Sequence, residues 1–225
     1  MDEEADSDIV ESEDSRVHAA SLLLKLRALG ITDRAVARAI ETVPRGNFVA
    51  PEWRAHAYED RPLPIACGQT ISPPSLVGLI TQALDLSDRH SVLDVGTGSG
   101  YHAAVISRIA RRVTSLDRFR TLVQAAERRW LGLGIRNITG VVADGRLGWP
   151  RQAPFDRILV TAAAEEVPVK LLSQLTDSGI LIVPIGPGDG EQRLTLFQRI
   201  GQNVDTNDLG SVRFGALESD IAQVL

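Results

Sequence analysis

The residues best suited to chemistry lie in a glycine-rich segment, VLDVGTGSGY, at positions 92–101. Its loop consists of Gly96, Thr97, Gly98, Ser99 and Gly100. Glycine has no Cβ, so the backbone can turn tightly and approach a ligand closely. Such a turn, placed between a buried strand and a helix, is typical of a ligand site at the carboxyl edge of a parallel sheet. We therefore expect this loop to bind a ligand.

Acidic residues accompany the loop. Asp117 ends the next predicted strand, 17 residues after Gly100. An acid there can accept hydrogen bonds from both ribose hydroxyls of an adenosine. Asp94 stands just before the loop and offers a carboxylate to an amino-acid end of the ligand. Asp144 and Gly145 end a third predicted strand, where they can reach the adenine edge; alternatively, Asp144 caps a turn.

The spacing of the glycines discriminates between nucleotides. The dinucleotide pattern G-x-G-x-x-G, started at Gly96, requires glycine at position 101, which is Tyr101. The observed G-x-G-x-G pattern, preceded by Asp94, better fits an adenosine that carries an amino-acid end. We therefore expect S-adenosylmethionine as the ligand, and a nicotinamide-dependent dehydrogenase is the weaker alternative.

The elements that must position these residues alternate along the chain from residue 91. Buried or alternating segments predict strands at 91–95, 111–117, 137–144, 155–163, 178–185, 191–200 and 208–217. Helical patterns follow the glycine loop, span 119–133 and cover 169–175, where Pro168 can open the helix. Strands that alternate with helices predict an α/β fold with a doubly wound, mainly parallel, Rossmann-like sheet and an antiparallel end.

The part before residue 91 differs in pattern. A helical face starts at Val17 and ends at Gly30, and Thr32 is a candidate N-cap for a second helix that ends near Pro44. Residues 44–74 contain six prolines and three aromatic residues, a composition that favours an irregular, functional segment. Helical spacing returns at 76–84.

Composition and charge bound the function classes. The 225 residues carry a formal net charge of -5, and eight acidic side chains without any Lys or Arg fall within residues 1–14. We expect 1–14 to be a disordered tail and 15–225 to be one folded domain, with an N-terminal extension (15–90) and a Rossmann-like core (91–225). The net charge disfavours nucleic-acid binding, and no apolar run is long enough for a membrane span. With no visible export signal and a single cysteine, Cys67, we expect a cytoplasmic monomer.

Several stretches together resemble one family. They are VPRGNFV (43–49), AYEDRPLPI (57–65), GQTIS (68–72), LDVGTGSGYHAAV (93–105), DGRLGWP (144–150), APFDRILVTAAA (153–164) and VPIGP (183–187). Over roughly residues 15–217, the chain resembles the protein-L-isoaspartate (D-aspartate) O-methyltransferase family. The resemblance implies methyl transfer from S-adenosylmethionine to the α-carboxylate of isoaspartyl residues in damaged proteins and peptides. The resulting ester collapses to a succinimide, which begins repair.

The resemblance also implies roles for individual residues. Ser72 corresponds to the residue that the family treats as catalytic. The cofactor side comprises Thr70, Ile71, Asp94, Gly96, Thr97, Gly98, Ser99, Gly100, Asp117, Asp144 and Gly145. The peptide side comprises Thr161, Ala162, Val212 and Phe214. Cys67 and the pair Gly215-Ala216 depart from the family pattern, which leaves open a relative of the same fold retargeted to a dedicated peptide or small carboxylic acid.

The chemistry places few demands on the protein. A carboxylate is already ionised at neutral pH, so the transfer requires no general base, metal or covalent nucleophile. Ser72 then acts as a hydrogen-bond positioner; the alternative is a turn residue before Pro73. None of the four histidines has a second ligand at metal spacing. For His102, which follows the glycine loop, we expect a surface or capping role; the alternative is a residue that lines the pocket. A cofactor-binding protein without catalysis is a further alternative.

Overall fold

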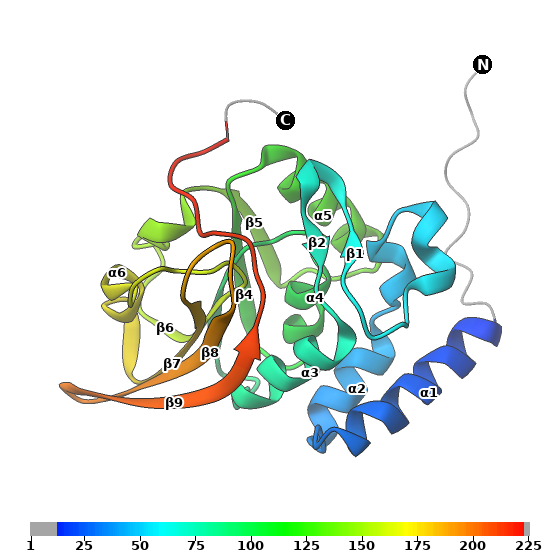
Figure 1. The fold of residues 1–225 in the computed structure, drawn as a ribbon, viewed down its shortest axis with the longest axis horizontal. Helices are drawn as coiled ribbons and strands as arrows, with labels where there is room; N and C mark the ends of the chain where they lie inside the picture. The colour runs from blue at the N-terminus through cyan, green and yellow to red at the C-terminus, as the bar shows by residue number, and fades with distance from the viewer. Residues whose placement is uncertain (1–12, 223–225) are drawn as a thin grey trace.

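The computed structural model describes residues 13–222, which are built around a seven-stranded sheet (Figure 1). The strands are β3 (Ser91–Val95), β4 (Arg112–Asp117), β5 (Ile138–Val142), β6 (Phe155–Val160), β7 (Leu175–Ile185), β8 (Gln192–Ile200) and β9 (Asn203–Val212). Their order across the sheet is β5-β4-β3-β6-β7-β8-β9. The first five are parallel, whereas β8 and β9 are antiparallel to their neighbours. The predicted mainly parallel sheet with an antiparallel end is confirmed.

The central strands are buried on both faces. All five residues of β3 are buried, and they alternate between two apolar cores. Val92 belongs to one core, whereas Leu93 and Val95 belong to the other. A strand that packs on both faces carries apolar residues on both, as Val92, Leu93 and Val95 do, which explains why the sequence predicts β3 so directly.

Helices cover the sheet, and the N-terminal helices lie beside it (Figure 1). They are α1 (Glu13–Ala28), α2 (Arg34–Thr42), α3 (Pro74–Ala83), α4 (Tyr101–Ser107), α5 (Arg120–Gly132) and α6 (Val169–Leu172). The helix predicted over 169–175 is shorter than expected. Leu175 pairs with Phe155 and begins β7, so the residue predicted to end the helix belongs to the sheet instead.

The first two helices differ from the sequence expectation in detail. Helix α1 begins at Glu13, so it includes the last two residues of the expected acidic tail, while residues 1–12 lie outside the described part. Thr32 is not the cap of α2. The cap is Asp33, whose carboxylate accepts the Val36 amide at 2.9 Å. The Thr32 amide instead donates to Gln82 Oε1 at 2.8 Å, which ties the turn to α3.

The proline-rich segment forms short elements that lie close to the glycine loop. Two 3₁₀ helices, η1 (Arg45–Phe48) and η2 (Pro51–His56), precede a hairpin of β1 (Leu63–Pro64) and β2 (Thr70–Ile71). The hairpin turn places Cys67 at φ 59°, in the left-handed region that favours glycine. A Cβ built on Gly98 would lie 3.7 Å from Ile65 Cδ1, so the hairpin packs beside the glycine loop.

Candidate active site

A cavity of about 930 Å³ lies at the carboxyl ends of the parallel strands. Its wall includes Val95 at the end of β3, Asp117 at the end of β4 and Thr161 just after β6. β3 pairs with β4 on one side and with β6 on the other, so the strand order reverses here. Ligands of open α/β sheets bind at such a reversal, which agrees with the position predicted from the glycine loop.

The glycine loop adopts a backbone that side chains would obstruct. Gly96, Gly98 and Gly100 have φ values of +106°, +53° and +87°. A Cβ on Gly96 would lie 2.3 Å from Thr161 Oγ1, the hydroxyl that donates to the Gly96 carbonyl at 3.0 Å. Thr161 therefore fixes the loop to the end of β6 besides lining the cavity.

Gly100 serves packing rather than the cavity wall. A Cβ at this position would lie 2.7 Å from Ala126 Cβ and 2.9 Å from Trp130 Nε1. The Trp130 indole donates to the Gly100 carbonyl at 2.9 Å, and Arg129 donates to the Ser99 carbonyl at 3.0 Å. Helix α5 thus holds the loop from behind. Arg129 contributes directly to this support.

Asp94 also lies behind the loop, not on the cavity wall. It is 1% exposed, and its Oδ2 accepts the Ser115 hydroxyl at 2.6 Å. Ser115 Oγ in turn accepts the Thr97 hydroxyl at 2.7 Å. Burial raises the pKa of Asp94 to about 7, and Oδ1 has no hydrogen-bond partner. The expected direct contact between Asp94 and a ligand is therefore not what the structure shows; the carboxylate positions Thr97.

Asp117 lies on the cavity wall, and its carboxylate can accept further hydrogen bonds from a ligand. Its Oδ2 accepts the Gly98 amide at 2.9 Å and its Oδ1 accepts the Phe119 amide at 3.0 Å. Each carboxylate oxygen therefore keeps a lone pair for a further donor. Burial raises the pKa of Asp117, and the backbone amides oppose that shift. The two remaining acceptor positions suit a pair of neighbouring hydroxyls.

The loop after β5 meets a segment from the C-terminal region. Asp144 caps a short 3₁₀ helix by accepting the Arg146 amide at 2.8 Å, and its other oxygen accepts the Asp220 amide at 3.1 Å. It does not line the cavity, so the alternative of a turn cap describes it. Gly145 does line the cavity. A Cβ at this position would lie 2.4 Å from Val95 Cγ1, so the close packing requires glycine.

Residues 213–222, which we call the strap, run from the end of β9 across the carboxyl edge of the sheet (Figure 1). The Ala163 amide donates to the Gly215 carbonyl and the Leu217 amide donates to the Ala163 carbonyl, both at 2.7 Å. Glu218 forms an ion pair with Arg118, and both residues line the cavity. The strand predicted over 208–217 extends into this segment, but β9 ends at Val212.

The segment around Ser72 forms another part of the wall. Thr70 and Ile71 belong to β2, and Ser72 follows directly, half-buried, before α3. Within residues 13–222, the Ser72 hydroxyl forms no hydrogen bond, so it is available to a ligand. The Ser72 carbonyl accepts Arg45 Nη2 at 2.7 Å. Arg45 lies in the VPRGNFV stretch, but no role was predicted for it.

The residues predicted to bind the peptide come from β9 and from the chain just after β6. Val212 and Phe214 line the wall, as does Ala162. Buried Gln192 accepts the Phe214 amide at 2.8 Å and donates to the Pro187 and Gly190 carbonyls at 2.6 and 2.9 Å. One glutamine therefore joins the end of β9 to the loop after β7. Nothing in the sequence pattern indicated that Gln192 would make these contacts.

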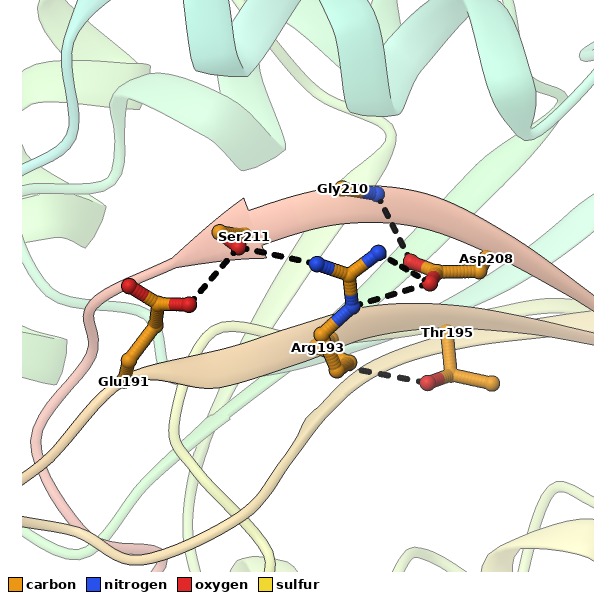
Figure 2. A network of polar contacts seen from close by, with 6 residues as sticks. All are labelled: Glu191, Arg193, Thr195, Asp208, Gly210 and Ser211. Atoms are coloured by element: carbon orange, nitrogen blue, oxygen red, sulfur yellow. Dashed lines mark hydrogen bonds and ion pairs between the residues drawn. The ribbon is translucent and has the colours of Figure 1, made fainter.

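An exposed network holds the β8–β9 pair beside this wall (Figure 2). Arg193 forms an ion pair with Asp208, and its Nη1 donates to Ser211 Oγ at 2.9 Å. Ser211, which lines the cavity, donates in turn to Glu191 at 2.9 Å. The Asp208 carboxylate also accepts the Gly210 amide at 2.9 Å. The network fixes the position of Ser211 immediately before Val212.

His102 was expected at the surface or at a helix cap, and this expectation is wrong. It lines the cavity, and its Nε2 lies 3.0 Å from Thr81 Oγ1. The Thr81 hydroxyl donates to the Val77 carbonyl at 2.7 Å, so His102 must supply the proton of the shared bond. Burial lowers the pKa of His102 to about 3, which keeps the imidazole neutral.

Most predicted site residues meet in this single cavity. On its wall lie Thr70, Ile71, Ser72, Gly96, Thr97, Gly98, Ser99, Asp117, Gly145, Thr161, Ala162, Val212 and Phe214. Off the wall lie Asp94, Gly100 and Asp144, each with a supporting contact given above. In the described residues, no group of three His, Cys, Asp or Glu side chains could hold a metal ion. No helix among them is long and apolar enough to cross a bilayer.

Comparisons with known proteins agree with this geometry. Residues 17–221 match the family model "Protein-L-isoaspartate(D-aspartate) O-methyltransferase". A protein-L-isoaspartate O-methyltransferase of Azorhizobium caulinodans is 51% identical over 217 residues, covering 96% of this chain and 100% of that protein. A protein of the same name from Dinoroseobacter shibae is 52% identical over 200 residues, covering 89% of this chain and 93% of that protein.

Solved structures give the same result. One protein-L-isoaspartate O-methyltransferase superposes with a TM-score of 0.80 at 31% identity, covering 90% of this chain and 67% of that one. A Plasmodium falciparum protein, named as a protein-L-isoaspartate O-methyltransferase and solved with S-adenosyl-L-homocysteine, superposes with a TM-score of 0.76 at 27% identity. That match covers 89% of this chain and 98% of the Plasmodium chain.

Proposed function

The chain belongs to the protein-L-isoaspartate(D-aspartate) O-methyltransferase family, and we propose how its cavity carries out that reaction. The enzyme transfers a methyl group from S-adenosylmethionine to the free α-carboxylate of L-isoaspartyl residues in damaged proteins and peptides. The products are a methyl ester and S-adenosylhomocysteine. The observation that carries the assignment of roles is the meeting of the Asp117 carboxylate and the unbonded Ser72 hydroxyl in one cavity.

The residues around Asp117 fit the methyl donor. Two lone pairs on Asp117 suit the two ribose hydroxyls, and the positive-φ glycines leave room where a Cβ would intrude. Phe119 and the strap residue Leu217 add apolar wall beside Gly145, which suits an adenine ring. When bound, S-adenosylmethionine supplies an electrophilic methyl group on a sulfonium. We assign donor binding to these residues.

Ser72 serves the acceptor side in this proposal. Its hydroxyl donates a hydrogen bond to the isoaspartyl carboxylate and holds one oxygen in line with the donor methyl. No residue needs to remove a proton, because the acceptor carboxylate is ionised at neutral pH. The cavity wall of β2, β9 and the strap displaces the water that would otherwise solvate the carboxylate. Ser72 is therefore a positioner and not a nucleophile.

Paired peptides test the proposal directly. The protein is given S-adenosylmethionine with a labelled methyl group and a peptide containing isoaspartate, or its twin with normal aspartate. Labelling of only the isoaspartyl peptide is the expected result. Equal labelling, or none, would refute the substrate assignment, and calorimetry with S-adenosylhomocysteine then tells whether donor binding survives.

A narrower substrate is the second candidate, favoured by the departures at Cys67 and Gly215-Ala216. The Gly215 carbonyl bonds to Ala163, next to the cavity residue Ala162, so this departure lies beside the peptide side of the site. A series of unrelated isoaspartyl peptides separates the candidates. Uniform activity supports general repair, whereas activity on one sequence, or on a small carboxylic acid alone, supports a dedicated substrate.

The cellular setting belongs to the same proposal. A single cysteine supports a reducing, cytoplasmic setting, and the net charge of -5 disfavours a nucleic-acid partner. We propose a monomer that acts as one domain, without nucleic acid or membrane. Sedimentation at several protein concentrations tests the monomer, and a concentration-dependent mass would contradict it.

A further inference from the structure

Arg45 is a fully buried arginine whose guanidinium reaches the segment that carries Ser72. Its side chain is 0% exposed. Nε donates to the Ala57 carbonyl and Nη2 donates to the Ser72 carbonyl, each at 2.7 Å. Nη1 is buried without a hydrogen-bond partner. A buried charge is costly unless it is compensated, so this arrangement calls for an explanation beyond folding.

Within the described part of the chain, no carboxylate is paired directly with this charge. Arg45 forms no ion pair there within 4.0 Å, and its Cζ lies 4.8 Å from the centroid of the Tyr101 ring. The Asp60 carboxylate attracts the Arg45 guanidinium only from a greater distance. Its Oδ1 accepts the Ser75 amide at 2.9 Å. Tyr101 and Ser72 both line the cavity, so the positive charge lies directly behind the wall.

Other positive groups near Ser72 are already engaged or exposed. Helix α3 starts immediately after Ser72, but Pro73 and Pro74 have no N–H, and the Ser75 amide is bonded to Asp60. On the cavity wall, Arg118 is paired with Glu218. Arg213 lies at the wall with an exposed side chain, where solvent screens its charge.

We propose that Arg45 is a positioning residue of the reaction, which attracts the acceptor carboxylate and fixes Ser72 to receive it. This inference rests on the proposed function, because it names the group that the charge serves. Arg45 does not touch the substrate; it acts through Ser72 and through its field at the cavity wall.

The charge balance of the reaction predicts which kinetic constant responds. The acceptor is negative before transfer and neutral as an ester afterwards, so a nearby positive charge stabilises the bound substrate more than the transition state. Loss of Arg45 should therefore raise KM for the peptide and leave kcat unchanged, or slightly higher. A residue needed only for folding would instead reduce the amount of active protein, which lowers the apparent kcat and leaves KM unchanged.

The test compares Arg45→Met, Arg45→Lys and a matched control, Arg157→Met. Arg157 is also a buried arginine, 7% exposed, and it donates to the backbone carbonyls of Leu84 and Asp85 away from the cavity. For Arg45→Met we expect the KM for an isoaspartyl peptide to rise about tenfold to thirtyfold, with kcat and S-adenosylhomocysteine affinity within about twofold. Arg45→Lys keeps the charge and should stay within about threefold of the wild-type KM. Arg157→Met should lower the thermal midpoint and leave KM unchanged.

Two results would overturn the proposal. Equal KM values for the Met and Lys variants would show that the charge is not used, and a large KM effect in Arg213→Met alone would assign recognition to the exposed arginine. Binding of the isoaspartyl peptide to protein saturated with S-adenosylhomocysteine is measured in parallel. That affinity reports on Arg45 even if the wild-type protein transfers no methyl group, so failure of the proposed function is distinguished from failure of this inference.

Discussion

Asp117 and Ser72 come from different elements and perform separable tasks. Asp117 ends β4 and presents two acceptor positions, whereas Ser72 follows β2 and presents one unbonded hydroxyl. In Asp117→Ala we expect donor affinity to fall by about 2 to 3 kcal/mol, from two lost hydrogen bonds to a charged group, with little change in kcat at saturating donor.

In Ser72→Ala we expect kcat/KM for the peptide to fall about tenfold or more, with donor affinity nearly unchanged.

Calorimetry with S-adenosylhomocysteine and steady-state kinetics measure these two effects. Asp177→Ala removes an exposed carboxylate of β7 outside the cavity and serves as the control. A collapse of donor affinity in Ser72→Ala would show that Ser72 belongs mainly to the donor side.

A second residue-scale prediction concerns Asp94 and pH. Burial raises its pKa to about 7, while an unfolded aspartate titrates near pH 3.9. Between these values the folded protein holds a proton that the unfolded chain releases, so the free energy of unfolding falls as pH rises from about 4 to about 7. Asp94→Asn removes this dependence, and its stability relative to wild type should improve by a few kcal/mol over that range.

Urea denaturation of both proteins at a series of pH values measures the difference. The comparison is needed because burial lowers the pKa of His102 to about 3, and that group makes stability fall as pH drops below about 6.5. The His102 contribution is common to both proteins and cancels. Parallel stability curves would mean that Asp94 is ionised throughout.

Single residues also mark the limit of the sequence analysis. Arginine is rarely buried, so nothing in VPRGNFV indicated that Arg45 would be fully enclosed behind Ser72. His102 was misassigned because its partner, Thr81, lies 21 positions earlier on another helix. Asp94 was placed correctly in a strand, but a strand pattern does not tell which side chain faces a cavity and which one supports a loop.

At the scale of elements, the support of the glycine loop by α5 gives a prediction. A Cβ at Gly100 would meet Ala126 and Trp130 within 3 Å, and φ is +87°. We expect Gly100→Ala to lower the free energy of unfolding by about 2 to 4 kcal/mol, through overpacking and backbone strain, and to weaken donor binding. Gly132→Ala is the matched control, because no atom lies within 4 Å of its added Cβ and it ends α5.

Denaturant unfolding and calorimetry measure the two effects. The control should be neutral or slightly stabilised, since alanine favours a helix over glycine. If Gly100→Ala were as stable as its control, the loop and α5 would not be coupled as the structure indicates.

Elements differ in how far the sequence predicts them. The strands β3, β4 and β6 were found because each carries β-branched or other apolar residues between turn signals, which fits their burial on both faces. The β1–β2 hairpin was not, because strands of two residues carry no periodicity. The helix predicted over 169–175 ends early, at Leu172, because Leu175 pairs with Phe155 in the sheet. A local helical pattern does not reveal such a pairing with a distant strand.

At the scale of the whole molecule, the acidic segment and the cavity are separate in sequence. The family match begins at residue 17, and the wall begins at Leu29. Deleting residues 1–12 removes six acidic side chains. We expect kcat/KM for an isoaspartyl peptide to stay within about twofold, because the family match begins only after this segment. Steady-state kinetics of the shortened and full chains at physiological salt check this, and a loss of tenfold would give the segment a role in the reaction.

The cavity wall has a consequence for the time course of folding. Ser72 and Val212 line the same cavity although 140 positions separate them, whereas β3, α4 and β4 are consecutive neighbours. Contacts between distant segments close slowly, because the chain entropy must be lost before the contact forms. A refolding chain should therefore regain its helical signal first and its affinity for S-adenosylhomocysteine last. During that interval the molecule is a nearly complete sheet without a working site, and donor added early should not speed the initial phase.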